Sequence, residues 1–210
     1  MVIVDTHCHV STLWYEPVES LLRQMDANDV ERAVLVQMGG EYDNAYQFEC
    51  VRAHPDRLAS AVLVDVALDS APDTLAELVD RGARGVRIPA GASVPALWAR
   101  ASELGLPVTS LGSADAFSSD AFAVNVAAMG GTPVIIEPPG GPKANSSQDA
   151  RAGVFAQARH PNAYMKVHGL GEFCQRNQPV TSPFPFDATG LPLLQEALEA
   201  FGAERRMWGS

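Results

Sequence analysis

The sequence predicts an α/β protein, a (β/α)8 barrel of the TIM type that is incomplete at its C-terminal end. Short continuous apolar runs alternate with stretches of helical periodicity, and such runs are typical of parallel strands buried on both faces. The unit of strand, loop and helix recurs about every 25–30 residues. Eight such strands favour a closed barrel over an open doubly wound sheet. No G-x-G-x-x-G motif follows the first strand, which disfavours a dinucleotide-binding sheet.

The expected strands are short apolar runs bounded by glycine, proline or polar residues. They cover residues 2–5, 33–38, 58–64, 85–88, 107–111, 133–137 and 163–167. Residues 206–209 resemble the opening of an eighth strand, at which the sequence ends. We therefore expect the last strand to be cut short and the last helix of the barrel to be missing.

The expected helices carry apolar residues three and four positions apart. They cover residues 16–25, 44–53, 71–81, 94–104, 118–129, 146–158 and 191–201. His54-Pro55 and His160-Pro161 end two of them, because proline disfavours helical backbone in the residue before it. We read both histidines as surface residues. No stretch indicates a domain boundary, so residues 1–210 are expected to form a single domain.

Composition excludes several classes of partner. The net charge of −10 argues against binding to nucleic acid or to an anionic membrane surface. The three cysteines fit no C-x-x-C pattern, which favours reduced thiols and a cytoplasmic protein. No basic-then-apolar leader and no run long enough to span a bilayer is found. We expect a small-molecule substrate, with a homo-oligomer as a further expectation.

The first ten residues, M-V-I-V-D-T-H-C-H-V, carry the strongest chemical signal. In a strand, His7 and His9 point to the same face, about 7 Å apart along the chain. Their imidazoles can then converge on one metal ion, for which neutral imidazole is the commonest protein ligand. The alternative is a pair of strand-end histidines in a polar rim, and the spacing alone does not decide between the two.

With this H-x-H strand first among eight, the sequence resembles the amidohydrolase superfamily, specifically the amidohydrolase-2 type. The motifs that carry the resemblance are V-D-T-H-C-H at 4–9, G-V-R at 85–87, I-I-E with two later glycines at 135–141, M-K-V-H-G-L-G-E-F at 165–173 and M-W-G-S at 207–210. The resemblance implies a metal-dependent hydrolase or lactonase or, in some branches, a decarboxylase. The implied cofactor is a divalent ion, with zinc first and manganese or iron as alternatives.

Three positions depart from the pattern of that family. Members often carry a histidine at the end of strand five, where this sequence reads Thr109-Ser110-Leu111. Pro138 stands where a second histidine is usual, and it has no side-chain lone pair for a metal. The aspartate that normally follows strand eight would come after Ser210. We therefore expect little catalysis from the chain as given. A non-catalytic relative that binds a small carboxylated ligand, or a fragment, remains the alternative.

Five further residues complete the candidate site. Glu137 and His168 are the candidate catalytic residues and possible third ligands of the metal. Arg87 is suited to bind a substrate carboxylate with two hydrogen bonds, and Lys166 and Glu172 are also expected to reach the substrate. The alternative for Glu137 is an ion pair with Arg87 or Lys166. The alternative for His168 is a hydrogen-bonded histidine of a loop.

Overall fold

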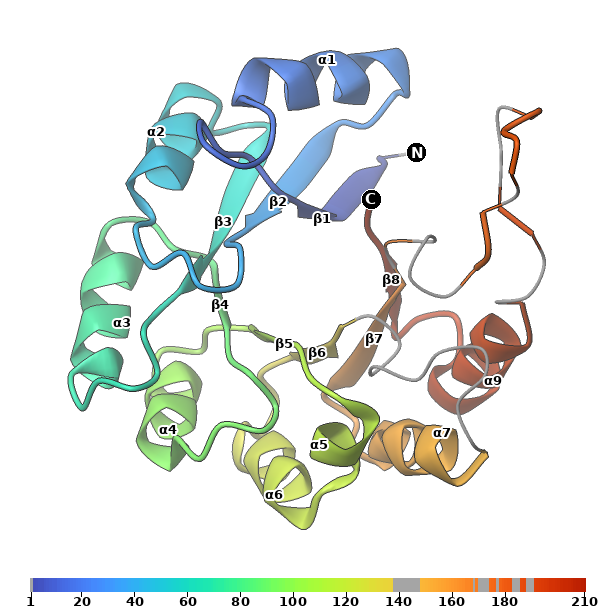
Figure 1. Ribbon diagram of the computed structural model, residues 1–210. Coiled ribbons are helices and arrows are strands. Elements are labelled where there is room, and N and C mark those ends of the chain that lie inside the picture. The colour runs from blue at the N-terminus through green and yellow to red at the C-terminus, as the bar shows by residue number, and fades with distance from the viewer. Residues whose placement is uncertain are drawn as a thin grey trace.

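Eight parallel strands form one ring in the computed structural model, which describes residues 2–137, 148–167, 169, 174–176, 178–182, 186–187 and 191–210. Each strand pairs with the next in sequence, from β1 to β8 (Figure 1). Their bounds are β1 (Val4–Cys8), β2 (Arg32–Val36), β3 (Leu58–Leu63), β4 (Gly85–Arg87), β5 (Val108–Ser110), β6 (Val134–Ile136), β7 (Ala163–Val167) and β8 (Arg206–Trp208). All eight expected strands are present, and the TIM-type barrel is confirmed.

The first strand differs most from its expected bounds. It was expected at residues 2–5, but β1 covers Val4–Cys8 and so includes His7. Pairing decides this, because Val4 lies opposite Arg32 and Cys8 opposite Leu35, with a shift of register between Asp5 and Cys8. The polar residues that face the barrel interior belong to the strand, although they interrupt the apolar run.

The helices lie outside the ring of strands (Figure 1). Their buried residues are mostly apolar and pack against the strands. They are α1 (Val18–Ala27), α2 (Ala45–Ala53), α3 (Ala71–Asp80), α4 (Pro95–Glu103), α5 (Ala114–Ser118), α6 (Asp120–Ala128), α7 (Gln148–Phe155), the 3₁₀ helix η1 (Ala156–Arg159) and α9 (Leu191–Phe201). The largest buried side chains between helices and strands include Leu75, Leu97, Trp98, Phe117 and Phe122. In the described part of the chain, no helix has both the length and the hydrophobicity needed to cross a membrane.

Residues 118–129 were expected to form a helix with Ser118 or Ser119 as its cap, and α6 confirms this helix with Ser119 as the cap. The short helix α5 that precedes it was not expected. Ser119 has extended backbone angles, and its hydroxyl accepts a hydrogen bond from the amide of Phe122. Ser113 caps α5 in the same way through the amide of Ala116. Two caps six residues apart stop one helix and start another, although the apolar residues continue across the break.

The ring is closed between its first and last strands by side chains. The hydroxyl of Thr6 donates to the carbonyl of Trp208 at 2.6 Å. The amide of Ser210 donates to Oδ1 of Asp5 at 3.0 Å. The two ends of the chain therefore lie side by side at this seam (Figure 1).

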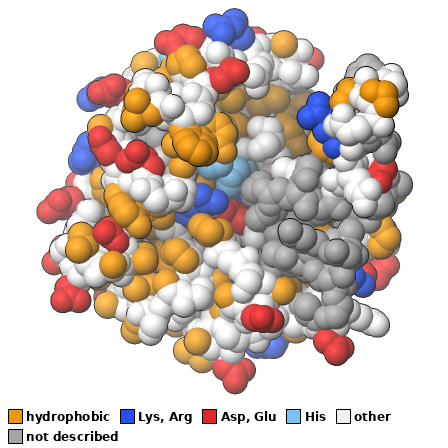
Figure 2. Space-filling model, viewed as in Figure 1, with side chains coloured by type: hydrophobic (Ala, Val, Ile, Leu, Met, Phe, Trp, Pro, Cys, Tyr) orange, Lys and Arg blue, Asp and Glu red, His pale blue; other side chains and the backbone are white. Residues whose placement is uncertain are grey.

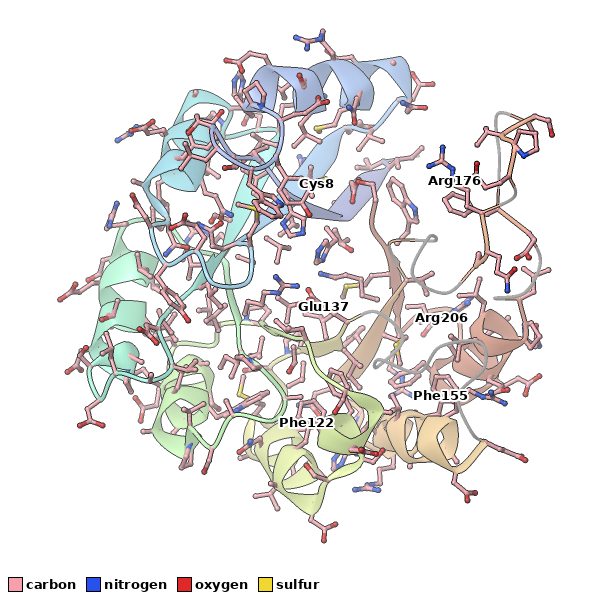
Figure 3. All side chains as sticks on the ribbon, viewed as in Figure 1. Cys8, Phe122, Glu137, Phe155, Arg176 and Arg206 are labelled. Carbon is pink, nitrogen blue, oxygen red and sulfur yellow. The ribbon has the colours of Figure 1, made fainter. Side chains whose placement is uncertain are left out.

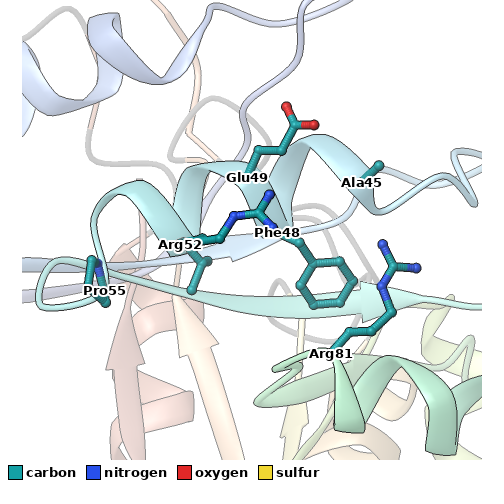
Figure 4. A pocket seen from close by; sticks show the side chains of 7 residues that line it. Ala45, Phe48, Glu49, Arg52, Pro55 and Arg81 are labelled. Atoms are coloured by element: carbon teal, nitrogen blue, oxygen red, sulfur yellow. The ribbon is translucent and has the colours of Figure 1, made fainter.

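The outer layer also has a shallow groove between α2 and the end of α3 (Figure 4). Phe48 forms part of its wall, and the guanidinium carbon of Arg81 lies 4.8 Å from the centre of the Phe48 ring. Arg52 and Pro55 line the same groove. These residues belong to the helical layer, and the polar side chains discussed below gather at the carboxyl ends of the strands instead.

Candidate active site at the mouth of the barrel

His7 and His9 meet at the carboxyl end of β1. Their Nε2 atoms are 3.1 Å apart, and their rings are perpendicular with centroids 4.8 Å apart. Nδ1 of His9 lies 2.7 Å from the carbonyl oxygen of Val36, which can only accept a hydrogen bond. The proton of a neutral His9 is therefore on Nδ1, and its Nε2 has a lone pair directed at His7. Burial and the neighbouring His7 lower the pKa of His9 to about 4, so this ring is neutral near pH 7.

The two histidines fit a divalent metal ion. Nitrogen ligands bound to one ion with tetrahedral or octahedral angles lie about 2.9–3.4 Å apart. The observed separation of 3.1 Å falls within this range. Nδ1 of His7 lies 3.2 Å from Oε1 of Glu137, and carboxylate or carbonyl partners behind the ring are typical of metal-binding histidines. Among the residues that the structure describes, no third histidine, cysteine, aspartate or glutamate completes a ligand set.

Glu137 lies just beyond β6 and is fully buried near the axis of the ring (Figure 3). Its Oε2 accepts hydrogen bonds from Nε and Nη2 of Arg87 at 3.1 and 2.9 Å. Its Oε1 accepts from the hydroxyl of Thr109 at 2.5 Å and lies 3.4 Å from Nζ of Lys166. Glu137 thus forms the ion pair that the sequence analysis gave as the alternative, and it does so with Arg87 and Lys166 together.

These contacts keep the carboxylate of Glu137 charged. Burial by itself raises its pKa, but the hydrogen bond with His7 and the charges of Arg87 and Lys166 hold the pKa well below its usual range. A carboxylate has about four lone-pair sites, and five donors from four residues surround this one. Glu137 therefore contacts four neighbouring side chains at once, and its part in catalysis stays a prediction.

Arg87, at the end of β4, keeps part of its hydrogen-bonding capacity. A guanidinium has five N–H groups. Two of them donate to Glu137, and Nη1 donates to the carbonyl oxygen of Gln37 at 3.0 Å. The remaining two have no partner among the described residues. They are suited to a planar anion such as a carboxylate.

Lys166 extends from β7 into the same space. Its Nζ lies 3.4 Å from each of three atoms: Oε1 of Glu137, Oγ1 of Thr109 and Nδ1 of His7. The contacts with Glu137 and Thr109 are long for a charge-assisted hydrogen bond, which is typically 2.7–2.9 Å, and Nδ1 of His7 does not accept one while it donates to Glu137. Burial lowers the pKa of Lys166, and the charge of Glu137 opposes that shift. A buried ammonium with such long contacts keeps hydrogen-bonding capacity for an anionic oxygen.

The structure thus brings together five of the seven residues predicted from the sequence, namely His7, His9, Arg87, Glu137 and Lys166. His168 and Glu172 lie outside the described residues. Sequence reasoning missed Thr109 as a partner of Glu137 and Gln37 as a partner of Arg87. Their positions could have identified them, because both are polar residues at the carboxyl ends of expected strands, where the active site of such a barrel lies.

A sequence model of the amidohydrolase-2 type, described as amidohydrolase, matches residues 4–210. The chain belongs to the amidohydrolase-2 family. This match confirms the resemblance drawn from the motifs and, at the level of the family, the expectation of a metal-dependent hydrolase. No curated protein sequence matches the chain.

Solved structures agree with the assignment. A candidate 2-pyrone-4,6-dicarboxylic acid hydrolase from Pseudomonas putida is 25% identical, with a TM-score of 0.77, and the match covers 100% of this chain and 82% of that one. An amidohydrolase from Burkholderia multivorans with bound zinc is 20% identical, with a TM-score of 0.75 and coverage of 100% and 84%. A similar protein from Acinetobacter baumannii, with citric acid bound, is 17% identical, with a TM-score of 0.74 and the same coverage. The last two show the shared fold.

Proposed function

We propose that this protein hydrolyses a C–O or C–N bond, in a lactone, ester or amide, of a small substrate that carries at least one carboxylate. The observation that carries the proposal is the position of two buried cations, Arg87 and Lys166, beside the paired imidazoles of His7 and His9. Figure 2 shows histidine next to basic and acidic side chains in a central hollow of this face. The 25%-identical relative is named for a cyclic ester with two carboxylates, which supports the lactone class.

Each described residue has a role in this proposal. The two remaining N–H groups of Arg87 bind a substrate carboxylate, and Lys166 binds a second anionic oxygen. Glu137 fixes both cations and the ring of His7. His7 and His9 hold a divalent ion, for which zinc suits imidazole ligands best, with manganese or iron as alternatives. When bound, such an ion polarises a carbonyl group and makes water more acidic. His168 stays a predicted catalytic residue, and Glu172 a predicted substrate-binding residue.

A second candidate function is the binding of a small carboxylated ligand without chemistry. The observation that favours it is the ligand count, because the described residues supply two metal ligands where a hydrolytic zinc site normally has three.

Metal analysis and turnover separate the two candidates. The protein is purified with zinc, manganese or iron and assayed on 2-pyrone-4,6-dicarboxylate as the lactone and an N-acyl amino acid as the amide. We expect one divalent ion per chain and slow hydrolysis that a chelator removes, both lost in His7→Ala. His54→Ala, a histidine of the opposite end of the barrel, is the matched control and should keep both. Binding of the carboxylates without metal or turnover, unchanged in His7→Ala, would establish the second candidate.

A further inference from the structure

A continuous path of buried hydrogen bonds connects α2 and β3 to Arg87. The hydroxyl of Ser60 donates to Oε1 of Gln47 at 2.7 Å, and Nε2 of Gln47 donates to Oε1 of Gln37 at 3.2 Å. The carbonyl oxygen of Gln37 in turn accepts from Nη1 of Arg87 at 3.0 Å. Ser60 is 0% exposed, Gln47 2% and Gln37 3%, so water does not substitute for these bonds.

Polar residues in this position need an explanation. The space between a helix and the sheet of a barrel is normally filled by apolar side chains, and an unpaired buried amide is costly. Phe48, the next residue of α2, lines the outer groove (Figure 4). Gln47 instead points inward and contacts Ser60 of β3. Both polar atoms of its amide have a partner. A buried network in which each of these side-chain polar atoms has a partner favours a single arrangement.

Gln37 is held just as firmly. Its Oε1 also accepts from the amide of Met38 at 2.9 Å, and its Nε2 donates to the carbonyl oxygen of Asp43 at 2.8 Å. Rotating the amide by half a turn would place like groups against each other at both positions, so its orientation is fixed. The side chain of Gln37 therefore ties together both ends of the segment between β2 and α2.

These contacts fix the orientation of the guanidinium group of Arg87. Glu137 engages Nε and Nη2 of the guanidinium, and among the residues that the structure describes the carbonyl oxygen of Gln37 alone engages Nη1. Two acceptors on different sides fix the plane of the group, and this plane determines where the two remaining N–H groups point. We infer that Gln47 is a positioning residue for Arg87 and acts through Gln37. What Arg87 binds rests on the proposed function, but its positioning does not.

The first test needs no ligand. Gln47→Met keeps the approximate volume and removes both hydrogen bonds, and Gln157→Met is the matched control. Gln157 is also a buried glutamine, 1% exposed, but it donates to the carbonyl of Phe117 on another side of the barrel. The readout is the solvent exchange of the Nε–H of Arg87, followed by 15N NMR. We expect exchange about tenfold faster in Gln47→Met, as for the loss of roughly one buried hydrogen bond, and unchanged exchange in Gln157→Met.

Two further variants keep this test decisive. Ser60→Ala removes only the outermost hydrogen bond and should speed the exchange about twofold to threefold, even if Gln47→Met does not fold. The double variant Gln37→Leu/Gln47→Met should exchange no faster than Gln37→Leu alone, because both act on one path. Unchanged exchange in Gln47→Met or, should that variant not fold, in Ser60→Ala overturns the inference. An additive effect in the double variant overturns it as well.

The second test uses isophthalate, a flat dicarboxylate without a hydrolysable bond. Binding should weaken about fivefold to tenfold in Gln47→Met and stay unchanged in Gln157→Met. With a turned-over substrate the change should appear in KM while kcat is retained, since a remote carboxylate is bound equally in the ground and transition states. If the wild-type protein binds no carboxylate, the proposed function fails, and the Nε–H exchange still decides the role of Gln47.

Discussion

Two arginine–carboxylate pairs at opposite ends of the barrel have the same length. Arg87 and Glu137 at the mouth are 2.9 Å apart, as are Arg57 and Asp26 at the other end. Their surroundings differ. The side chains of the first pair are 11% and 0% exposed, and those of the second are 34% and 67% exposed.

Burial, not distance, decides what each pair contributes. An exposed pair is screened by water and salt and is typically worth about 0–1 kcal/mol. A buried pair has lost its hydration, so either partner becomes costly once the other is removed. Replacing such a pair by apolar residues is often neutral or stabilising. The buried charges at the mouth are therefore better explained by ligand binding than by stability.

The largest expected effect is that of Glu137→Ala. The variant leaves Arg87 and Lys166 as buried cations without a counter-charge, so the free energy of unfolding should fall by about 3–5 kcal/mol. Urea denaturation measures this. A loss below about 1 kcal/mol, comparable to that of an exposed pair, would remove the distinction between the two ends of the barrel.

An intermediate effect is expected from Lys166→Met, and it should appear in binding. The contacts of Nζ are all 3.4 Å, and Arg87 still neutralises Glu137 in the variant, so the free energy of unfolding should change by less than about 1 kcal/mol. Binding of isophthalate should weaken about tenfold or more, because a charged hydrogen bond is lost. Calorimetry measures the affinity, and unchanged affinity would remove Lys166 from the ligand site.

The smallest effect is expected at the exposed pair. Asp26→Asn should lower the free energy of unfolding by less than about 1 kcal/mol, and the difference should vanish in 1 M NaCl because the Debye length is then about 3 Å. The loss in Glu137→Ala should persist at the same salt concentration, since dissolved salt screens buried charges much less than exposed ones. Equal salt sensitivity in the two variants would contradict the comparison.

Much of the fold was predictable because its signals are local. The alternation of apolar runs and helical stretches predicted the bounds of every strand of the barrel to within a few residues. Sequence reasoning placed the cap of α6 at Ser118 or Ser119 but missed α5, a helix of five residues that Ser113 caps just before it. It also missed that β1 extends to Cys8, because the partner strand sets the end of a strand as much as its own composition does.

The sequence by itself determined that His7 and His9 share a face, because side chains alternate along any strand. Only the tertiary structure decided the role of Glu137. Its partners Thr109, Lys166 and Arg87 are 28, 29 and 50 positions away and belong to three other strands. No local pattern specifies which of them a carboxylate will meet, since closure of the barrel brings those strand ends together. The same holds for Gln47, which resembles any polar helix residue until packing places Ser60 and Gln37 against it.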